Sequence, residues 1–427
     1  MAFRRRAHHS FRGRNRDEWI ESKGGRSPVP PIPTPPLGEV LATIEHHELE
    51  DCTTQSYDPV QISNMQYLTS YNWVSGKHEI IVPGEPPAWT PLSEPTQLRE
   101  DSGVYFRDLN SARHPTYPLE PMVRAVLIDN RDFCVEDLDV VGCGSTLGNL
   151  LRFACGKGPA FRMLIEVIGD TVFFSRRENS PTETIQNVRG FGHTFPEAYT
   201  TWGENIRNSE SHQRLITFDF ANMKCLVRFE SDGYLPDLIP EHLKIQKDPI
   251  SNKDYVGPED ILSSMQAATI STVHSAIPEQ EPSPLRILKR GRYIPQCAIF
   301  DLKTRSVRKA DFDTLSEQMG RLWIRQIPNF VLAYHRSGKF NDIRVQDVRQ
   351  EIKQWEQSQQ PDLRRFASLL QMIVSFARST EDRKLELEHG EDEKFLNLRI
   401  PGGVVRSALP PDLAENWNAR FSSSLGS

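Results

Sequence analysis

The sequence feature that most restricts the fold is an apolar run that ends in charged residues, Ile299-Phe300-Asp301-Leu302-Lys303. Successive side chains of a β-strand point to opposite faces, so Asp301 and Lys303 share one face and Leu302 lies on the other. A carboxylate beside an ammonium group at a strand end suits a metal-dependent phosphodiester-cleaving site, in which the acid holds the cation and the lysine steers the attacking water. The alternative interpretation is a surface salt bridge.

A second apolar strand ends in the same way. Residues 212–220 and 223–232 predict a strand pair, and Glu230 and Asp232 close its second strand on one face. Another acid, Glu197, follows a glycine- and aromatic-rich segment. Acids at strand ends are often only solvated surface charges. Several such acids that follow one another along the chain, however, provide the hard oxygen ligands that Mg²⁺ prefers. We therefore predict a magnesium-type site from Glu197, Glu230, Asp232 and Asp301, with Lys303 beside them.

Composition indicates a water-soluble globular protein. The chain has 427 residues, of which 37% are hydrophobic and 25% charged, with a formal net charge of -6. This length allows one large domain or two medium ones. We expect no membrane span and no secretory signal peptide, because no apolar run is long enough for the first and the arginine-rich start lacks an apolar core. The six cysteines form no C-x-x-C pair, which favours a reducing compartment without a disulfide framework or zinc site.

Three segments differ in composition from the rest. Residues 1–37 form a basic, proline-rich arm that we expect to be disordered, as a phosphate-binding tail, a mitochondrial presequence or a solvated extension. Residues 235–290 are rich in Pro, Ser, Glu and Lys, which predicts a mobile insertion. Residues 379–427 are expected to be a polar tail. Between them, periodicity predicts a hairpin over 162–174, a strand over 327–334, and helices over 119–129, 137–153, 313–323 and 363–376.

Two further groups of residues have a structural interpretation. Glu166 lies within an apolar strand and is expected to be a buried, paired carboxylate outside the site. The aromatic residues Tyr67, Tyr71 and Trp73 could stack a base, but we favour packing in the core.

The ordered motifs resemble those of the DXO-like decapping exoribonucleases, a family of the PD-(D/E)XK nuclease superfamily, in a divergent fungal-type form. The resemblance rests on five segments: 192–199, 228–232, 299–304, 327–339 and 363–377. It implies an α+β fold with a mixed β-sheet nuclease core flanked by helices, in one main domain over residues 38–378.

The resemblance also implies an activity and its residues. It implies a metal-dependent hydrolase that removes incomplete or non-standard caps from the 5′ end of RNA and digests RNA 5′ to 3′, with Mg²⁺ or Mn²⁺. The implied compartment is the nucleus or cytoplasm, with the mitochondrion left open by the arginine-rich start. The implied catalytic residues are Glu230, Asp232, Asp301 and Lys303, the metal ligands are Glu197, Glu230, Asp232 and Asp301, and the substrate-binding residues are Arg152, Lys303 and Gln326.

The sequence departs from the family pattern at several of these positions. Pro196 is inserted in the first acidic motif, and Asp301 stands where the family has glutamate. The arginine expected at a helix start corresponds to Gly144, so this phosphate contact is either missing or supplied by Arg152. The family's W-x-Q motif is shifted, so that Gln326 is the nearest counterpart of its glutamine.

These departures keep an alternative function open. A catalytically weak relative would act as a partner or stabiliser of another 5′–3′ exoribonuclease. An enzyme is expected to bring the four carboxylates within reach of one cation, at the end of a basic cleft.

Overall fold

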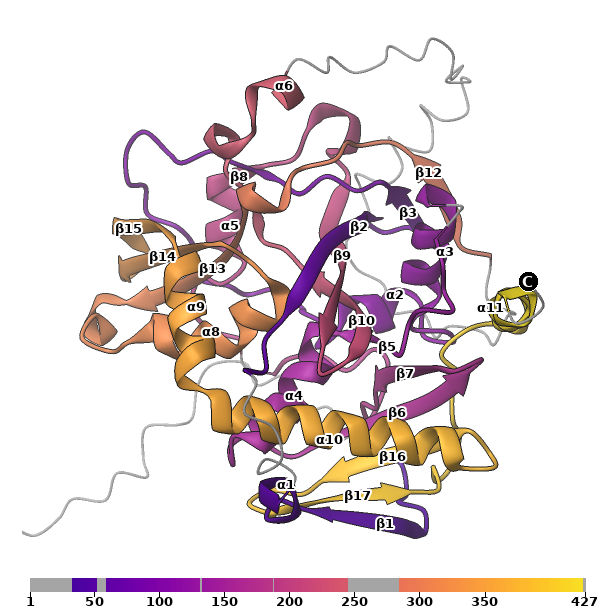
Figure 1. The fold of residues 1–427 in the computed structure, drawn as a ribbon. Coiled ribbons are helices and arrows are strands. Elements are labelled where there is room, and N and C mark those ends of the chain that lie inside the picture. The colour runs from indigo at the N-terminus through magenta and orange to yellow at the C-terminus, as the bar shows by residue number, and fades with distance from the viewer. Residues whose placement is uncertain (1–32, 52–58, 131–132, 187, 245–283, 425–427) are drawn as a thin grey trace, which may run out of the picture. The chain divides into compact units, whose positions relative to one another are not determined.

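Two mixed β-sheets form the framework of the computed structural model, which describes residues 33–51, 59–130, 133–186, 188–244 and 284–424 (Figure 1). Contacts group Thr34–Ser427 into one compact unit. The larger sheet has the strand order β1-β17-β16-β6-β7-β5-β10-β9-β2-β3-β12, and the smaller has β15-β14-β13-β11-β4-β8. This mixture of sheets and helices confirms the α+β fold class.

The strands of the larger sheet come from all parts of the chain. They are β1 (Val40–Glu45), β2 (Ser63–Val74), β3 (Glu79–Val82), β5 (Val140–Cys143), β6 (Phe161–Ile168), β7 (Thr171–Arg176), β9 (Ser209–Phe220), β10 (Met223–Glu230), β12 (Arg286–Lys289), β16 (Lys384–His389) and β17 (Phe395–Arg399). The smaller sheet contains β4 (Ala88–Trp89), β8 (Thr200–Thr201), β11 (Gly233–Tyr234), β13 (Ile299–Ser306), β14 (Asn329–Arg336) and β15 (Lys339–Asp347).

Helices pack on both faces of the larger sheet. Their bounds are α1 (Glu48–Asp51), α2 (Leu109–Arg113), α3 (Glu120–Asp129), α4 (Gly144–Ala154), α5 (Thr194–Tyr199), α6 (Glu241–Lys244), α8 (Thr314–Arg325), α9 (Arg349–Ser358), α10 (Gln360–Ser379) and α11 (Pro411–Ser424). The long helix α10 runs beside α4 and the strands of this sheet in Figure 1.

The alternation of side chains along β10 explains the two cores. Cys225 and Val227 join the core that α4 and α10 cover, whereas Leu226 joins the core that α3 and α11 cover. Since neighbouring strand residues face opposite ways, a strand that is apolar at consecutive positions must be covered on both sides. A separate core, which includes Phe300 and Phe340, lies between α5 and the smaller sheet.

Most of the elements expected from periodicity are present. The hairpin over 162–174 is β6–β7, the strand pair over 212–232 is β9–β10, and the helix over 313–323 is α8. The predicted helix over 137–153 is only partly right, because residues 140–143 form strand β5 and α4 begins at Gly144. Tyr71 and Trp73 are fully buried, which confirms their place in the core.

The expectation of a polar tail after residue 378 is wrong. β16 and β17 form a hairpin between β6 and β1 in the larger sheet, and Leu385, Leu387, Leu396 and Leu398 are buried in its core. The polar residues that alternate with these leucines face the other side of the hairpin, so the segment has the composition of a tail but the period of a strand.

The predicted insertion over 235–290 is also shorter than expected. At its start, Leu235 and Ile239 are buried around a 3₁₀ turn, and at its end β12 pairs in parallel with β3. The middle of the predicted insertion, residues 245–283, lies outside the described residues, as do residues 1–32 of the predicted arm.

Among the described residues, no helix has the length and apolarity needed to cross a membrane.

The packing of α11 gives a test of the C-terminal segment. Trp417 is 1% exposed, stacks edge-on against Phe173 and donates a hydrogen bond of 3.1 Å from its indole nitrogen to the Thr171 hydroxyl. Trp417→Ala is expected to lower the free energy of unfolding by about 3–5 kcal/mol, measured by urea denaturation. Val404→Ala is the control, because Val404 is 99% exposed. Equal stability of the two variants would contradict the docking of α11.

Candidate functional site

The two sheets meet where β10 passes into β11. Glu230 ends β10, and Asp232 lies just before β11, which pairs with β13 of the smaller sheet. The Asp232 carboxylate accepts a hydrogen bond of 2.7 Å from the Leu302 backbone N–H. Gly233 is required at this crossing, because a Cβ there would come within 2.5 Å of the Phe300 ring. The crossing thus places two of the predicted acids beside β13.

The side chains of β13 alternate between the two faces of the strand as predicted. Phe300 and Leu302 face the core of the smaller sheet, so Asp301 and Lys303 lie on the opposite face. The interpretation of Asp301 as part of a surface salt bridge is wrong, because Asp301 is only 1% exposed. Its partners come from a different element.

Two arginines of α8 hold Asp301. Nη2 of Arg321 lies 2.8 Å, and Nη1 of Arg325 3.3 Å, from the same oxygen, Oδ2 of Asp301. Because β13 and β14 are parallel, the chain between them must cross over, and α8 is this crossover helix. Its start is capped by Asp313, whose side chain accepts from the Ser316 N–H. Four residues separate the arginines, so they project from one face of the helix.

The space at Gly144 is filled by Arg325. A Cβ at Gly144 would lie 3.1 Å from Nε and 3.2 Å from Cγ of Arg325. Gly144 is the first residue of α4, so a guanidinium group does lie at this helix start, but it is supplied by α8.

Burial and like charges raise the pKa of the strand-end acids. Burial, with the Asp232 carboxylate beside it, raises the pKa of Glu230 to about 7. Burial and Asp301 raise the pKa of Asp232, which Arg321 and Lys303 oppose. The Glu230 side chain is nevertheless exposed. Solvent therefore reaches one end of a group of charged side chains that we call the acidic cleft. Its members are Glu230, Asp232, Asp301, Lys303, Arg321 and Arg325.

The cationic side chains of the acidic cleft are shifted as well. Burial, together with neighbouring Arg321, lowers the pKa of Lys303 and lowers that of Arg325 to about 10. A carboxylate with a pKa near 7 can take up a proton near neutral pH, and the cations beside it can offset charge that develops on a phosphate.

Several buried polar atoms of the acidic cleft lack a hydrogen-bond partner. They are Oδ1 of Asp301 and Nε of both Arg321 and Arg325. Buried polar atoms are normally paired, so these atoms have unused capacity for water or a ligand.

Another buried guanidinium group, that of Arg228, lies on β10, the strand that ends at Glu230. Arg228 is on β10, two residues before Glu230, and its nearest polar contacts are Tyr71 Oη at 3.5 Å and Asp108 Oδ2 at 3.8 Å. Its Nε has no hydrogen-bond partner. Asp108 also helps to raise the pKa of Glu230, so this cation and the acidic cleft belong to one electrostatic environment.

Glu197 is not part of the acidic cleft. It lies exposed on α5, and its charge acts on the nearby imidazole of His193. Phe195 and Tyr199 of α5 pack with Phe300 and Leu302, on the face of β13 opposite Asp301 and Lys303.

The two predicted substrate-binding residues outside β13 also lie elsewhere. The Arg152 guanidinium donates to the Asn149 side chain on its own helix and packs over Gly158, at the far end of α4 from Gly144. The Gln326 side chain donates to the Trp323 carbonyl at the left-handed end of α8. Neither residue contacts the carboxylates of the acidic cleft.

The described residues do not fit the four-carboxylate metal site that the sequence predicts. They contain no group of three or more His, Cys, Asp or Glu side chains placed to hold a metal ion. Three of the predicted acids share the acidic cleft, but the fourth is absent from it and Asp301 is engaged by two guanidinium groups.

Arg321 and Arg325 were missed at the sequence level. Their spacing of four residues on the helix after β13 would place them on one face, which is a weak signal that many surface helices share. The parallel pairing of β13 with β14 makes α8 a crossover helix, and its packing brings the face with these arginines over Asp301.

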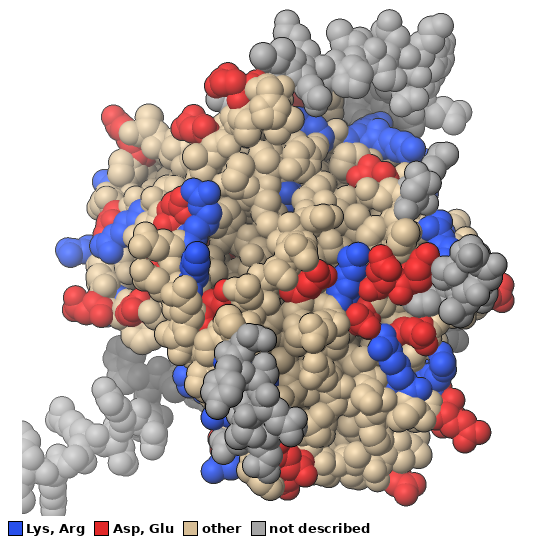
Figure 2. Space-filling model, in the orientation of Figure 1, with Lys and Arg blue, Asp and Glu red and all other residues tan. Residues whose placement is uncertain are grey.

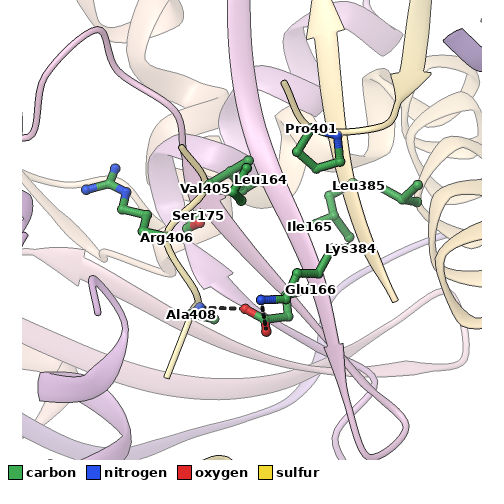
Figure 3. Close-up of a pocket in the computed structure, with 10 residues that line it drawn as sticks. All are labelled: Leu164, Ile165, Glu166, Ser175, Lys384, Leu385, Pro401, Val405, Arg406 and Ala408. Atoms are coloured by element: carbon green, nitrogen blue, oxygen red, sulfur yellow. Dashed lines mark hydrogen bonds and ion pairs between the residues drawn. The ribbon is translucent and has the colours of Figure 1, made fainter. Parts of the chain in front are cut away.

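Two hollows of the surface lie apart from the acidic cleft. One is a recess of about 10 Å³, room for about one water, between β6, β16 and residues 401–408 (Figure 3). There Glu166 accepts from the Ala408 N–H at 2.6 Å and pairs with Lys384 at 3.1 Å, which confirms it as a paired carboxylate. The other is an open groove between α10 and the β9–β10 turn.

Charges of both signs are interspersed on the face that Figure 2 shows, and much of its centre is formed by other residues. The described residues therefore form no continuous basic surface on this face.

The sequence matches, over residues 40–417, the family described as a domain of unknown function, DUF8563. The chain belongs to the DUF8563 family. A comparison with curated proteins finds no match.

Solved structures share the fold. Rai1 from Scheffersomyces stipitis, in complex with (3′-NADP)+ and calcium ion, has a TM-score of 0.55 at 10% identity, over 90% of this chain and 99% of its own. Rai1 from Candida albicans, in complex with pU5-Mn2+, has a TM-score of 0.52 at 11% identity, over 87% of this chain and 98% of its own. These likenesses confirm the fold that the DXO-like motifs imply.

Removal of the Asp301 charge tests the ion pairs of the acidic cleft. Asp301→Asn leaves two largely buried guanidinium groups without their shared partner, so the free energy of unfolding is expected to fall by about 3 kcal/mol in urea titrations. The control is Asp347→Asn, which breaks an exposed ion pair with Arg349 and is expected to cost about 1 kcal/mol or less. Similar losses in the two variants would refute the buried pairing.

The raised pKa of Glu230 predicts a pH dependence of stability. Between the usual glutamate pKa and about 7, the folded protein keeps a proton that the unfolded chain has lost, so this residue makes stability fall as pH rises through that window. Glu230→Gln is therefore expected to reduce the fall in melting temperature between about pH 5 and about pH 8. Exposed Glu381→Gln is the control, and an unchanged profile in Glu230→Gln would contradict the raised pKa.

Proposed function

We propose that this chain binds and hydrolyses the phosphate-bearing 5′ end of RNA in the acidic cleft. The observation that carries the proposal is this grouping of charged side chains, in which Glu230, with a pKa of about 7, lies among carboxylates and the cations Lys303, Arg321 and Arg325. The shared fold supports RNA as the substrate class, because the Candida albicans Rai1 of the same fold was solved in complex with pU5-Mn2+. Removal of incomplete or non-standard caps is the finer form of the proposal.

The chain's own residues would divide the chemistry among them. Arg321, Arg325 and Lys303 would bind the phosphate oxygens and offset the charge that grows on them in the transition state. Glu230 would take the proton of the attacking water, since a base with a pKa near the working pH transfers protons efficiently. Asp301 would orient the two guanidinium groups, to which it is already paired.

A second candidate function is binding of the RNA end without turnover, as a partner or stabiliser of a 5′–3′ exoribonuclease. The pairing of Asp301 with two arginines favours it, because this carboxylate is then engaged in the free protein. The position of Glu197 outside the acidic cleft favours it as well.

Hydrolysis of defined RNA ends separates the two candidates. Purified protein is incubated with RNAs that carry a monophosphate, a triphosphate, an unmethylated cap or an NAD cap, in EDTA or in Mn²⁺, and the products are resolved by mass spectrometry. Lys303→Gln is expected to lower the rate about 100-fold, as loss of a charge stabiliser does. The control Lys309→Gln alters an exposed lysine and is expected to act as wild type.

The outcomes are distinct. RNA that binds but stays intact under every condition would support the second candidate, and equal rates in Lys303→Gln and wild type would refute the assigned site. The absence of both binding and hydrolysis would reject the proposed function.

A further inference from the structure

The acidic cleft has a balanced charge without any added ion. Its three carboxylates carry three negative charges when ionised, and three basic side chains face them. Two of these bases, Arg321 and Arg325, pair with Oδ2 of Asp301 and so offset the charge of a carboxylate that a cation would need. The acids are Glu230, Asp232 and Asp301, and the bases are Lys303, Arg321 and Arg325.

The two arginines keep most of their hydrogen-bonding capacity. A guanidinium group has five N–H donors in a planar fork, and each arginine directs one nitrogen at Asp301. The Nε of each is buried without a partner, as is Oδ1 of Asp301. The fork of an arginine matches the oxygens of a phosphate group, and bonds of this type are among the stronger ones in proteins.

Position and exposure suit a ligand that enters from the cleft. The Arg325 side chain is 13% exposed and packs against Gly144, so its guanidinium group is held in place. The Arg321 side chain is 30% exposed and lies four residues earlier on the same helix face. One side of the pair is therefore fixed by protein and the other can be reached from solvent.

We infer that Arg321 and Arg325 form a phosphate clamp that takes the place of a divalent cation in the acidic cleft. Asp301 holds the clamp in the free protein, and the terminal phosphate of an RNA 5′ end adds to its unused donors. Recognition of the 5′-phosphate then needs no metal ion. This inference rests on the proposed RNA-end substrate.

Binding without metal is the first test. A short oligouridylate with a 5′-monophosphate and its 5′-hydroxyl counterpart, both labelled at the 3′ end, are titrated with protein in EDTA and followed by fluorescence anisotropy. Wild type is expected to bind the phosphorylated RNA about tenfold more tightly or better, the effect of one charge-assisted hydrogen bond. Arg321→Gln is expected to lose this preference. Arg305→Gln, which alters an arginine of β13 paired with Glu317, is expected to keep it.

Loss of folding is controlled by a compensated variant. Removal of one arginine leaves the buried Asp301 carboxylate with less positive charge beside it, which can itself destabilise the fold. A variant that combines Asp301→Asn, Arg321→Gln and Arg325→Gln removes the charged partners together, which costs less stability than leaving one of them unpaired. Far-UV circular dichroism and melting temperature are compared with wild type before binding is measured. This folded variant is also expected to lose the preference for 5′-phosphate.

Direct binding of Mn²⁺ is the second test and does not depend on RNA. Electron paramagnetic resonance measures free Mn²⁺ in the presence of protein. Wild type is expected to bind it weakly, whereas Arg321→Gln combined with Arg325→Gln frees Asp301 and is expected to gain about tenfold or more in affinity. Arg305→Gln is expected to match wild type.

Each result decides the inference. A preference for 5′-phosphate that appears only when Mn²⁺ or Mg²⁺ is added, or that survives in the folded compensated variant, would overturn the clamp while leaving the proposed function intact. Tight Mn²⁺ binding by wild type would also overturn it. If neither RNA binds with or without metal, the proposed function and the clamp both fail.

Discussion

The burial of Asp301 is the constraint on which the acidic cleft depends. A carboxylate that is 1% exposed is costly unless it is paired, and here two guanidinium groups on one oxygen provide the pairing. That requirement fixes which face of α8 packs on β13, and Gly144 leaves the room at the start of α4 that Arg325 occupies. The helix register, the glycine and the acid therefore depend on one another.

The same region joins the two sheets. Glu230 ends a strand of the larger sheet, and Asp232 accepts a hydrogen bond from the backbone of the smaller one. A change at this crossing would alter both the alignment of the sheets and the distance between the acids. In this molecule the groups available for chemistry are also groups that hold the framework together.

Local pattern was enough to predict much of the framework. The apolar pattern of β10 and β13 placed Glu230 at the end of its strand and Asp301 with Lys303 on one face of theirs, whereas Asp232 lies just beyond the end of β10. Composition misled for the C-terminal segment, because β16 and β17 alternate leucines with polar residues, of which Glu386 and Asn397 are buried as well. The proximity of Arg321 and Arg325 to Asp301, and of Arg325 to Gly144, could not be predicted from the sequence. It depends on how α8, which connects the parallel strands β13 and β14, packs against α4, which follows β5 of the parallel pair β5–β10.

The first strand of the larger sheet has a consequence for how the protein is made. Within the described sheet, β1 (Val40–Glu45) pairs only with β17 (Phe395–Arg399), so its backbone partner is translated some 350 residues later, as in the Thr43–Asn397 side-chain contact. During synthesis the backbone groups of β1 therefore stay unpaired until β17 has been made, and long-range strand pairing of this kind forms slowly. A chain truncated before β17 would leave β1 without its pairing partner. Such a chain is expected to be prone to aggregation and to degradation by quality-control proteases.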